Sequence, residues 1–504
     1  MKFKKILIAN RGEIAVRILR TCKELGIQTV SVHSTADESS LHVKSADESV
    51  CIGPPKSSLS YLNIPAILSA AEITGAEAIH PGFGFLSENK EFAELCNKWE
   101  LEFIGPKPDC LGKMGDKINS KILAKKAGLP VLHSIEVKYR ERGEILKEVK
   151  ELGFPVIIKA SAGGGGRGMK VVENETELFD AIPRLEQEAK AGFGNDTLFI
   201  EKYIRSPRHI EVQILADRFG QILHLGERDC TIQRRFQKIL EESPSPILSQ
   251  KKRDEICSCA VNLAKYVDYD SAGTVEFLFD QDSQNFYFME MNTRIQVEHP
   301  ITEQRTGIDI VAQQIMVAQN ERIKFQQSDI NFSGHAIECR LNAEDPVTQF
   351  PCPGKIQYYY RPAGIGIRVD DFIYSRYSVP PFYDSLLAKI IAYAPTRVET
   401  IERMRRALDE FKIEGVKTTI PFHLAVLHNK NFYKGRFTTN FIEKNNIMDE
   451  IKKYYEHKRK ELTNEKKVII VSTAVAKYIE RKNGSIKANS WTMAGRQELM
   501  ENEI

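Results

Sequence analysis

Strong net charge, long apolar runs and paired cysteines are all missing from this sequence of 504 residues. Its 71 Lys and Arg nearly balance 68 Asp and Glu, so a net charge of +3 gives no general attraction to nucleic acid or to a membrane surface. No segment approaches the ~18 apolar residues of a membrane span. The apolar stretch Ile6–Ala9 is shorter than the ~7–15-residue core of a signal peptide. We therefore expect a cytoplasmic protein with no membrane span and no nucleic-acid partner.

The nine cysteines contain no Cys-x-x-Cys pair. The two that lie closest, Cys257 and Cys259, fall in a run with helical character, where alternate residues point to different sides. We expect free thiols in a reducing compartment and neither disulfides nor a zinc site.

Strand and helix signals alternate through residues 1–114. Strand-like segments at 5–9, 28–33 and 77–82 are separated by helical patterns at 12–26 and 61–75. This order predicts a parallel sheet covered by helices, and therefore an α/β domain. The first turn reads Asn-Arg-Gly-Glu, so it lacks the glycines of a Gly-x-Gly-x-x-Gly dinucleotide site.

The rest of the chain has a different pattern. Residues 115–330 contain strands in antiparallel hairpins, and residues 331–446 combine short strands at 334–341 and 355–360 with a helix at 397–411, which indicates an α+β arrangement. The segment 447–504 is highly charged at 452–467 and apolar at 468–479. Two interpretations of this last segment stay open, a docking arm and a solvated tail.

Four consecutive glycines, residues 163–166, separate strand-like segments at 156–158 and 170–172. Each glycine costs about 0.5–1 kcal/mol of backbone entropy relative to alanine, so the run calls for an explanation. A flexible lid whose N–H groups surround phosphates is one, and a loose surface hairpin is the alternative. No Gly-Lys-Ser/Thr opens a helix here, so this is not a Walker loop.

Two β-rich segments, 275–280 and 286–292, flank a turn at 281–285. A hairpin centred on Ser283 places Glu276 opposite Glu290 and Leu278 opposite Phe288. Carboxylates ~5 Å apart repel by about 3 kcal/mol at an effective dielectric constant of ~20. A bound divalent cation would turn this repulsion into a site, and oxygen ligands favour Mg²⁺ or Mn²⁺. The alternative is a solvated face on which the repulsion is screened.

From Glu290 to Glu298 the even positions are polar and most odd positions are apolar. A period of two places the polar groups Glu290, Asn292, Arg294, Gln296 and Glu298 on one side of an extended segment. Such a row suits a small anion held by Arg294 beside a base at Glu298. A half-buried strand with a polar outer face would show the same alternation.

Two charged stretches complete the candidates. Glu201 and Lys202 end a strand-like segment at 197–200, where backbone groups are available for a purine edge. Residues 226–242 bring Gln233, Arg234, Arg235 and Lys238 close to acidic residues, although a solvated charged face has the same composition.

These segments together resemble the biotin carboxylase family of ATP-grasp enzymes across residues 1–446. The family's motifs occur in order: ILIANRGEIAVRI, HPGFGFLSEN, FIGP, MGDK, KASAGGGGRGM, EKYI, RHIEVQ, GERDC, QRRFQK, EMNTRIQVEHP and IECR. The resemblance implies a Rossmann-like N-terminal domain (1–114), an ATP-grasp domain (115–330) with a mobile lid at about 132–203, a mixed C-terminal domain (331–446) and an extension (447–504).

The resemblance also implies roles for individual residues. ATP contacts would come from Lys117, Lys159, Gly164, Gly165, Gly166, Glu201, Lys202, His209, Gln233, Glu276 and Glu290. Metal ligands would be Glu276 and Glu290, with Asn292 close by. Lys238, Arg294, Gln296, Val297 and Glu298 would form the bicarbonate pocket, with Glu298 as catalytic base and Arg340 facing the ureido group of biotin.

The implied chemistry is coherent. Glu298 would assist deprotonation of bicarbonate for attack on the γ-phosphate of ATP, and carboxyphosphate would release CO₂ and phosphate in a closed site. That phosphate would take the N1′ proton of biotin, and Arg340 would stabilise the ureido oxyanion. Two departures remove polar groups: Phe83 replaces the more frequent Tyr near the biotin site, and Phe236 replaces a His near the nucleotide. We expect both to tune affinity.

The biotin attachment signal Ala-Met-Lys-Met does not occur in the chain. We therefore expect a biotin carboxyl carrier protein and a carboxyltransferase as separate partners, and the family implies a homodimer. The expected function is the biotin carboxylase subunit of an acetyl-CoA (acyl-CoA) carboxylase, as in fatty acid biosynthesis. The alternatives are the biotin carboxylase subunit of a two-subunit pyruvate carboxylase, a non-catalytic ATP-binding scaffold, and a carbamoyl-phosphate-type ligase, which needs a duplicated ATP-grasp half.

Overall fold

The computed structural model describes residues 2–138, 140–161, 168–453, 455–456, 472–473 and 475, and the chain divides into two units, Met1–Ile447 and Met448–Ile504. The described residues of the second unit are helical. Most of the predicted docking arm at 447–504 therefore lies outside the described residues.

The first unit begins with a five-stranded parallel sheet in the order β3-β2-β1-β4-β5. Its strands are β1 (Lys5–Ile8), β2 (Gln28–Ser34), β3 (Glu48–Gly53), β4 (Ala78–His80) and β5 (Glu102–Phe103). The helices of this region are α1 (Gly12–Glu24), α2 (Leu41–Ser45), α3 (Ile64–Thr74), α4 (Lys90–Lys98) and α5 (Pro108–Gly115). The predicted α/β arrangement is confirmed, and its strand order is that of a Rossmann-like sheet.

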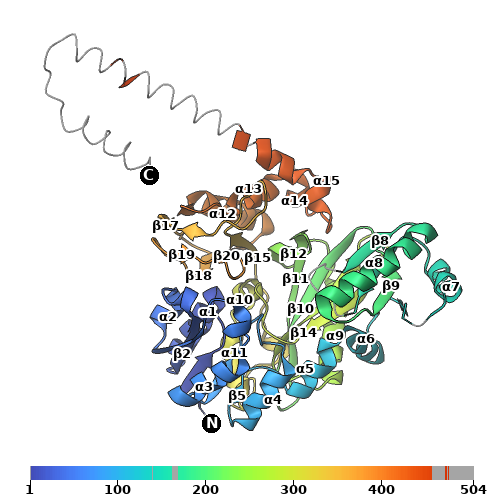
Figure 1. Ribbon diagram of the computed structural model, residues 1–504. Helices are drawn as coiled ribbons and strands as arrows, with labels where there is room; N and C mark the ends of the chain where they lie inside the picture. Colours follow the sequence, from blue (N-terminus) through green and yellow to red (C-terminus); the bar gives the residue numbers. More distant parts are fainter. Residues whose placement is uncertain are drawn as a thin grey trace. The chain divides into compact units, whose positions relative to one another are not determined.

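A separate four-stranded antiparallel sheet follows, in the order β6-β9-β7-β8. It contains β6 (Ser134–Glu136), β7 (Val156–Ala160), β8 (Met169–Val172) and β9 (Leu198–Lys202). Helix α6 (Lys117–Lys126) precedes it, and α7 (Arg142–Leu152) and α8 (Glu175–Phe193) belong to it. Figure 1 shows α7, α8 and their strands to one side of the blue N-terminal layer. That this lobe is the mobile lid at about 132–203 stays a prediction.

The largest sheet has eight antiparallel strands in the order β14-β13-β10-β11-β12-β15-β20-β18. They are β10 (Pro207–Ala216), β11 (Ile222–Arg234), β12 (Gln237–Ser243), β13 (Ala272–Asp280), β14 (Phe286–Asn292), β15 (His335–Asn342), β18 (Ile367–Asp371) and β20 (Leu386–Ala394). Since β12 pairs with β15, this sheet is continuous across residue 330. It carries most of the candidate site.

The remaining elements surround that sheet. They are α9 (Gln250–Tyr266), α10 (His299–Thr306), α11 (Ile310–Ala318), α12 (Arg397–Glu410), α13 (Ile420–His428), α14 (Lys430–Tyr433) and α15 (Phe441–Lys444), with the short strand pairs β16 (Gly354–Lys355) with β19 (Ser378–Val379) and β17 (Tyr358–Tyr360) with β21 (Lys412–Glu414). No helix among the described residues is long and apolar enough to cross a membrane.

Helix α9 shows how one face of the large sheet is covered. The Ser249 side chain caps its first turn by accepting a hydrogen bond from the Lys252 N–H. Ile256 and Leu263 of this helix belong to the same buried apolar cluster as Val212 of β10 and Phe277 of β13. Side chains alternate across a strand, so apolar residues on this face leave the opposite face of β10 and β13 for polar groups. All nine cysteines are free, and Cys257 and Cys259 lie on α9 as predicted.

Candidate functional site

Three glutamates lie side by side across neighbouring strands of the large sheet. Glu211 of β10 is opposite Glu276 of β13, and Glu276 is opposite Glu290 of β14. The predicted pairing of Glu276 with Glu290 is confirmed. The predicted pairing of Leu278 with Phe288 is wrong, because the register shifts between Glu276 and Phe277 and places Leu278 opposite Tyr287. A bulge adds a residue to one strand, which hairpin counting from the turn cannot detect.

The carboxylate of Glu290 stands out in this row. Burial and the negative charge of Glu276 raise its pKa, while Lys117, at the start of α6, acts in the opposite direction. Two carboxylates side by side on neighbouring strands fit a divalent cation with oxygen ligands. The donor set predicted for a metal, Glu276 and Glu290 with Asn292, is therefore chemically suitable.

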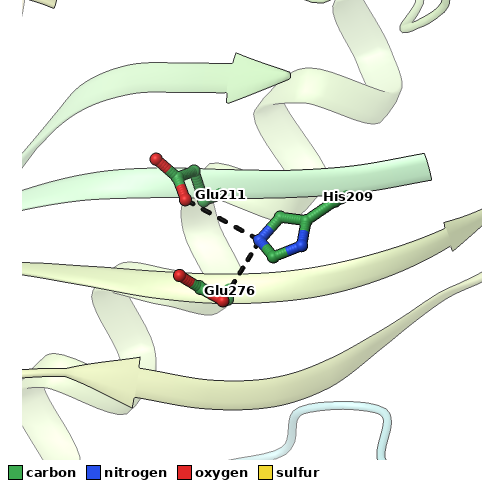
Figure 2. A group of neighbouring side chains, drawn as sticks. All are labelled: His209, Glu211 and Glu276. Carbon is green, nitrogen blue, oxygen red and sulfur yellow. Dashed lines mark ion pairs between the residues drawn. The ribbon is translucent and has the colours of Figure 1, made fainter. Parts of the chain in front are cut away.

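His209 adds a nitrogen to the acidic row, as Figure 2 shows. Its Nε2 lies 3.1 Å from Glu276 Oε2 and 3.8 Å from Glu211 Oε2. Its Nδ1 is 3.0 Å from Nε2 of Gln233, which comes from β11. The predicted nucleotide contacts His209, Gln233 and Glu276 thus lie together on one face of the large sheet. A second grouping, His209 with Glu211 and Glu276, has its ligand atoms close enough to one another to hold a metal ion.

Lys238, the second residue of β12, brings one positive charge to these carboxylates. Its Nζ donates to Glu211 at 2.5 Å and to Glu276 and Glu298 at 2.8 Å each. Burial alone would lower the pKa of Lys238, but the three carboxylates raise it well above its usual value. Lys238 is therefore a fixed positive charge, which suits the binding of an anion more than the transfer of a proton.

Glu298 lies between two cations. It accepts from Lys238 at Oε1 and from Arg340 Nη2 at Oε2, at 2.9 Å. Burial opposes its ionisation, but Lys238 and Arg340 outweigh that effect and hold the pKa of Glu298 well below its usual value. Glu298 is therefore ionised at neutral pH and able to accept a proton. A second carboxylate also holds Arg340, because the Arg340 Nε donates to Glu241 at 2.6 Å.

The segment after β14 does not continue as the predicted extended row. The strand ends at Asn292, the chain bends at Arg294, and α10 begins at His299. The alternation of polar and apolar residues therefore does not mark a strand here, because polar side chains on a turn reach the site as well. Gln296 donates to Glu276 at 2.7 Å, and Asn292 does so at 2.9 Å. The same residues meet at one place by a different backbone path.

Arg294 and Val297 occupy the edge of this cluster. Arg294 donates from Nε to Glu88 and from Nη2 to Asn292, both at 2.9 Å. The carbonyl oxygen of Val297 accepts from the fully buried Lys389 at 2.8 Å. Arg294 is held at the edge of the acidic cluster by Glu88 of the N-terminal region, a residue for which the sequence predicted no role.

A second cluster lies on the four-stranded sheet. Lys159 donates to Glu201 at 2.8 Å, and Lys121 and Ser134 contact the other oxygen of Glu201. The positive charges of Lys159 and Lys121 overcome the effect of burial and lower the pKa of Glu201 to about 2. Lys202 donates to the carbonyl oxygens of Gly153 and Phe154. Gly164, Gly165 and Gly166 lie outside the described residues.

Phe83 belongs to neither cluster. It lines a pocket of about 360 Å³ together with residues of segments 10–14 and 382–384, and its carbonyl oxygen accepts from Asn10 at 2.8 Å. Phe236 forms the turn between β11 and β12, with 63% of its surface exposed and a positive φ of 64°. A bulky residue rarely adopts this conformation.

The sequence predicted no role for Glu211, Arg228, Glu241 or Lys389. Glu211 was detectable, because His209, Glu211 and Gln213 alternate with apolar residues in the same way as the segment after Glu290. Arg228 is fully buried and donates to Glu211 at 2.5 Å and to Gln296 at 2.8 Å. Along the sequence it is one more charge in a mixed run, and only the strand register distinguishes it.

Comparison with known protein families assigns most of the chain. Residues 2–111 match "Biotin carboxylase, N-terminal domain", residues 116–326 match "Carbamoyl-phosphate synthase L chain, ATP binding domain", and residues 338–444 match "Biotin carboxylase C-terminal domain". The chain is 53% identical to biotin carboxylase 1 of Bacillus subtilis over 446 residues, which cover 88% of this chain and 99% of the relative.

A second relative extends further. The chain is 49% identical to a pyruvate carboxylase subunit of Methanothermobacter thermautotrophicus over 492 residues, which cover 96% of this chain and all of the relative. Among solved structures, it is similar to the biotin carboxylase domain dimer of the Hydrogenobacter thermophilus 2-oxoglutarate carboxylase, solved with MgADP, ADP and bicarbonate. That match has a TM-score of 0.85 and 48% identity, and it covers 89% of this chain and 99% of that one.

Proposed function

The chain belongs to the biotin carboxylase family of ATP-dependent ligases, and from this premise we propose that it uses ATP and bicarbonate to carboxylate biotin on a separate carrier protein. The observation that carries the proposal is the position of Glu298, an ionised carboxylate held between Lys238 and Arg340. The two fixed cations can bind an anion beside Glu298, and the Glu298 carboxylate can accept the proton of that anion.

We assign bicarbonate to the groups around Glu298. Lys238 and Arg294 would supply positive charge, Gln296 an amide and Val297 a backbone group, and Glu298 would accept the proton of bicarbonate as it attacks the γ-phosphate. Arg340 would stabilise the negative charge that develops on the ureido oxygen of biotin. The anion would replace part of the present contacts between Glu298 and the two cations.

Nucleotide would bind between the two clusters of the first unit. His209, Gln233 and Glu276 would contact it from the large sheet, and Lys117, Lys159, Glu201 and Lys202, with the glycine run 164–166, from α6 and the lid. Glu276 and Glu290, with Asn292 nearby, would hold Mg²⁺ or Mn²⁺, which neutralises phosphate charge during phosphoryl transfer. The position of Glu290 directly opposite Glu276 supports this assignment.

Replacement of Glu298 by Gln tests the catalytic assignment. The amide keeps the size of the side chain but cannot accept the proton, so we expect bicarbonate-dependent, biotin-stimulated ATP hydrolysis to fall at least ~100-fold while ATP affinity is unchanged. Glu303→Gln is a suitable control, because Glu303 is also buried but pairs with Arg17 and Arg368 away from this cluster. Turnover like that of the wild type in Glu298→Gln would remove Glu298 from the mechanism. A non-catalytic scaffold would show no bicarbonate-dependent hydrolysis even in the wild type.

The final acceptor depends on the partner that receives carboxybiotin. We propose the biotin carboxylase subunit of an acetyl-CoA (acyl-CoA) carboxylase, which would supply fatty acid biosynthesis. The biotin carboxylase subunit of a two-subunit pyruvate carboxylase is a second candidate. One observation favours this second candidate. The match to the Methanothermobacter pyruvate carboxylase subunit extends over 492 residues, whereas the match to the Bacillus relative covers 446. Carboxyl transfer to acetyl-CoA or to pyruvate by the copurified carrier and transferase distinguishes the two.

We further propose the domain limits 1–114, 115–330 and 331–446, a cytoplasmic homodimer, and a docking role for 447–504. Removal of residues 448–504 should leave biotin-stimulated ATP hydrolysis in place and weaken association with the transferase. A truncated chain that keeps the affinity of the full chain for its partners would contradict the docking role. Sedimentation that shows a stable monomer would contradict the homodimer.

A further inference from the structure

Two buried carboxyl groups face each other behind Arg340. Glu241 of β12 is opposite Glu338 of β15 in the antiparallel ladder, and both side chains are completely buried. Directly opposed residues on one face of an antiparallel pair have Cβ atoms about 4.5–5.5 Å apart. Two carboxylates at that spacing would repel each other strongly where water is excluded.

The hydrogen bonds of the two groups differ. Glu241 accepts from Arg340 Nε at Oε1, and its Oε2 has no hydrogen-bond partner among the residues that the structure describes. Neither oxygen of Glu338 has a hydrogen-bond partner in the described part of the chain. On this opposed pair, three buried carboxyl oxygens therefore have no hydrogen-bond partner among the described residues, whereas most buried polar atoms in proteins are paired.

The cations around Glu338 are already engaged by other groups. Arg340 binds Glu241 and Glu298, and Lys238 binds Glu211, Glu276 and Glu298. Lys389, opposite Arg340 on β20, donates to the Val297 carbonyl and lies 3.1 Å from Glu13. Among the described residues, no cation lies within ion-pair distance of the Glu338 carboxyl group.

Charged and titratable groups surround Glu338 from the elements packed against it. Glu241 comes from β12, Arg340 from β15 itself, Lys389 from β20 and Glu298 from the segment before α10. Helix α10, which packs on β15, adds His299, whose pKa is held well below its usual value by burial, so it is neutral. Burial raises the pKa of Glu338 well above its usual value, and the charges of Glu241 and Glu298 act in the same direction. Burial also raises the pKa of Glu241, to about 7, but the charge of Arg340 acts against this rise.

An isolated buried carboxylate avoids its desolvation cost by binding a proton. A neutral carboxylic acid then has one O–H group to donate. The unsatisfied Oε2 of Glu241 lies across the ladder from it, whereas Glu241 Oε1 already receives a charged donor. The proton therefore belongs on Glu338, because Glu241 is the group in contact with the Arg340 guanidinium.

We propose that Glu338 is a positioning residue that is protonated at neutral pH and donates a hydrogen bond to Glu241, so that Glu241 remains ionised and holds Arg340 against Glu298. The inference rests on the proposed function, in which Arg340 faces biotin. Glu338 touches no substrate. It acts through Glu241, and its neutral form prevents a second negative charge from drawing Arg340 away from Glu298.

The test compares two variants at Glu338 with the wild type. Glu338→Gln is neutral and still has a donor for Glu241, whereas Glu338→Leu is neutral without a donor. We expect kcat/KM for free biotin to stay within about threefold in Glu338→Gln and to fall at least ~10-fold in Glu338→Leu, with KM for ATP unchanged in both, because one weakened hydrogen bond on a charged group is worth roughly a factor of ten or more.

Infrared difference spectroscopy of the full chain at pH 7 measures the proton directly. The C=O stretching band of a buried carboxylic acid should be present in the wild type and lost in Glu338→Gln. Glu242→Gln is the matched control on the same strand as Glu241, because Glu242 is ionised by Arg397 and His335 and contributes no such band.

The outcomes are separable from those of the proposed function. A wild type without biotin-stimulated hydrolysis contradicts the proposed function, and the infrared comparison still decides whether Glu338 holds a proton. An acid band that is unchanged in Glu338→Gln overturns the inference, and so does a loss in Glu338→Gln as large as that in Glu338→Leu. If Glu338→Leu does not fold, the infrared result and the kinetics of Glu338→Gln decide.

Discussion

At the scale of single residues, three carboxylates share one ammonium group. Lys238 Nζ lies 2.5 Å from Glu211 and 2.8 Å from Glu276 and Glu298, and all four side chains are shielded from solvent. Removing one member of a buried charge cluster leaves the others uncompensated, which is more harmful than losing a surface ion pair.

Lys238→Gln should therefore lower the free energy of unfolding by about 3–5 kcal/mol and biotin-stimulated ATP hydrolysis at least ~100-fold. Lys252→Gln is the matched control, because Lys252 pairs with Glu255 on the surface of α9. That change should cost less than about 1 kcal/mol and leave turnover as in the wild type. Urea unfolding and steady-state kinetics measure both effects, and equal behaviour of the two variants would contradict this account of the cluster.

Glu242 gives a prediction for pH dependence. Burial opposes its ionisation, but Arg397 and His335 lower its pKa from 4.5 to about 2. A carboxyl group with a lowered pKa in the folded state stabilises the protein above its unfolded pKa, and this contribution is lost as the pH falls toward the folded pKa. The stability gap between the wild type and Glu242→Gln should shrink by about 3 kcal/mol between pH 5 and pH 2.

Urea midpoints over this pH range measure the gap for Glu242→Gln and for Glu402→Gln. Glu402 pairs with Arg405 at the surface, so its gap should be small and nearly constant. A gap for Glu242 that does not change with pH would show that Arg397 and His335 do not stabilise its charge.

At the scale of elements, α12 shows how local sequence fixes a boundary. The Thr396 side chain accepts from the Glu399 N–H, and the Glu399 side chain accepts from the Thr396 N–H. This capping box satisfies two N–H groups that the first turn of a helix leaves unpaired. Thr400 then fastens the helix to the large sheet, because its hydroxyl donates to the His335 carbonyl at 3.0 Å.

Thr396→Ala should lower the free energy of unfolding by about 1 kcal/mol, because the N-cap oxygen is lost while the helix body is unchanged. Thr396→Ser keeps that oxygen and should behave as the wild type does. Thermal unfolding of both variants tests the cap, and an alanine variant as stable as the serine variant would show that the capping box contributes nothing.

At the scale of the whole molecule, ligand binding should stabilise the fold through the acidic row. A ligand at 100 times its dissociation constant stabilises the folded state by about 2.7 kcal/mol. Saturating ATP with Mg²⁺ should therefore raise the unfolding temperature by several degrees, and EDTA should remove most of that increase. In Glu290→Gln, which lacks one of the assigned ligands, Mg²⁺ should add little to the effect of ATP alone. A full magnesium effect in that variant would place the metal elsewhere.

Local patterns along the chain were enough to predict the kinds of layer and to nominate many of the candidate site residues. The alternation of strand and helix patterns predicted the parallel sheet. The hairpin of β13 and β14 and the pairing of Glu276 with Glu290 were also predicted, because they depend on contacts between neighbours in the chain. The family motifs supplied Lys238 and Arg340, which no local pattern distinguishes from residues of a charged surface.

How these residues come together depends on the strand register and on the packing of the folded chain. Three features could not be counted from the sequence: the bulge beside Glu276, the turn that carries Gln296 and Glu298 into the site, and the pairing of β12 with the distant strand β15. The opposition of Glu241 and Glu338 is of the same kind, since 97 residues separate them and only strand register brings them together. Charge compensation in a buried site depends on such register, and register is set by the whole sheet rather than by any one of its strands.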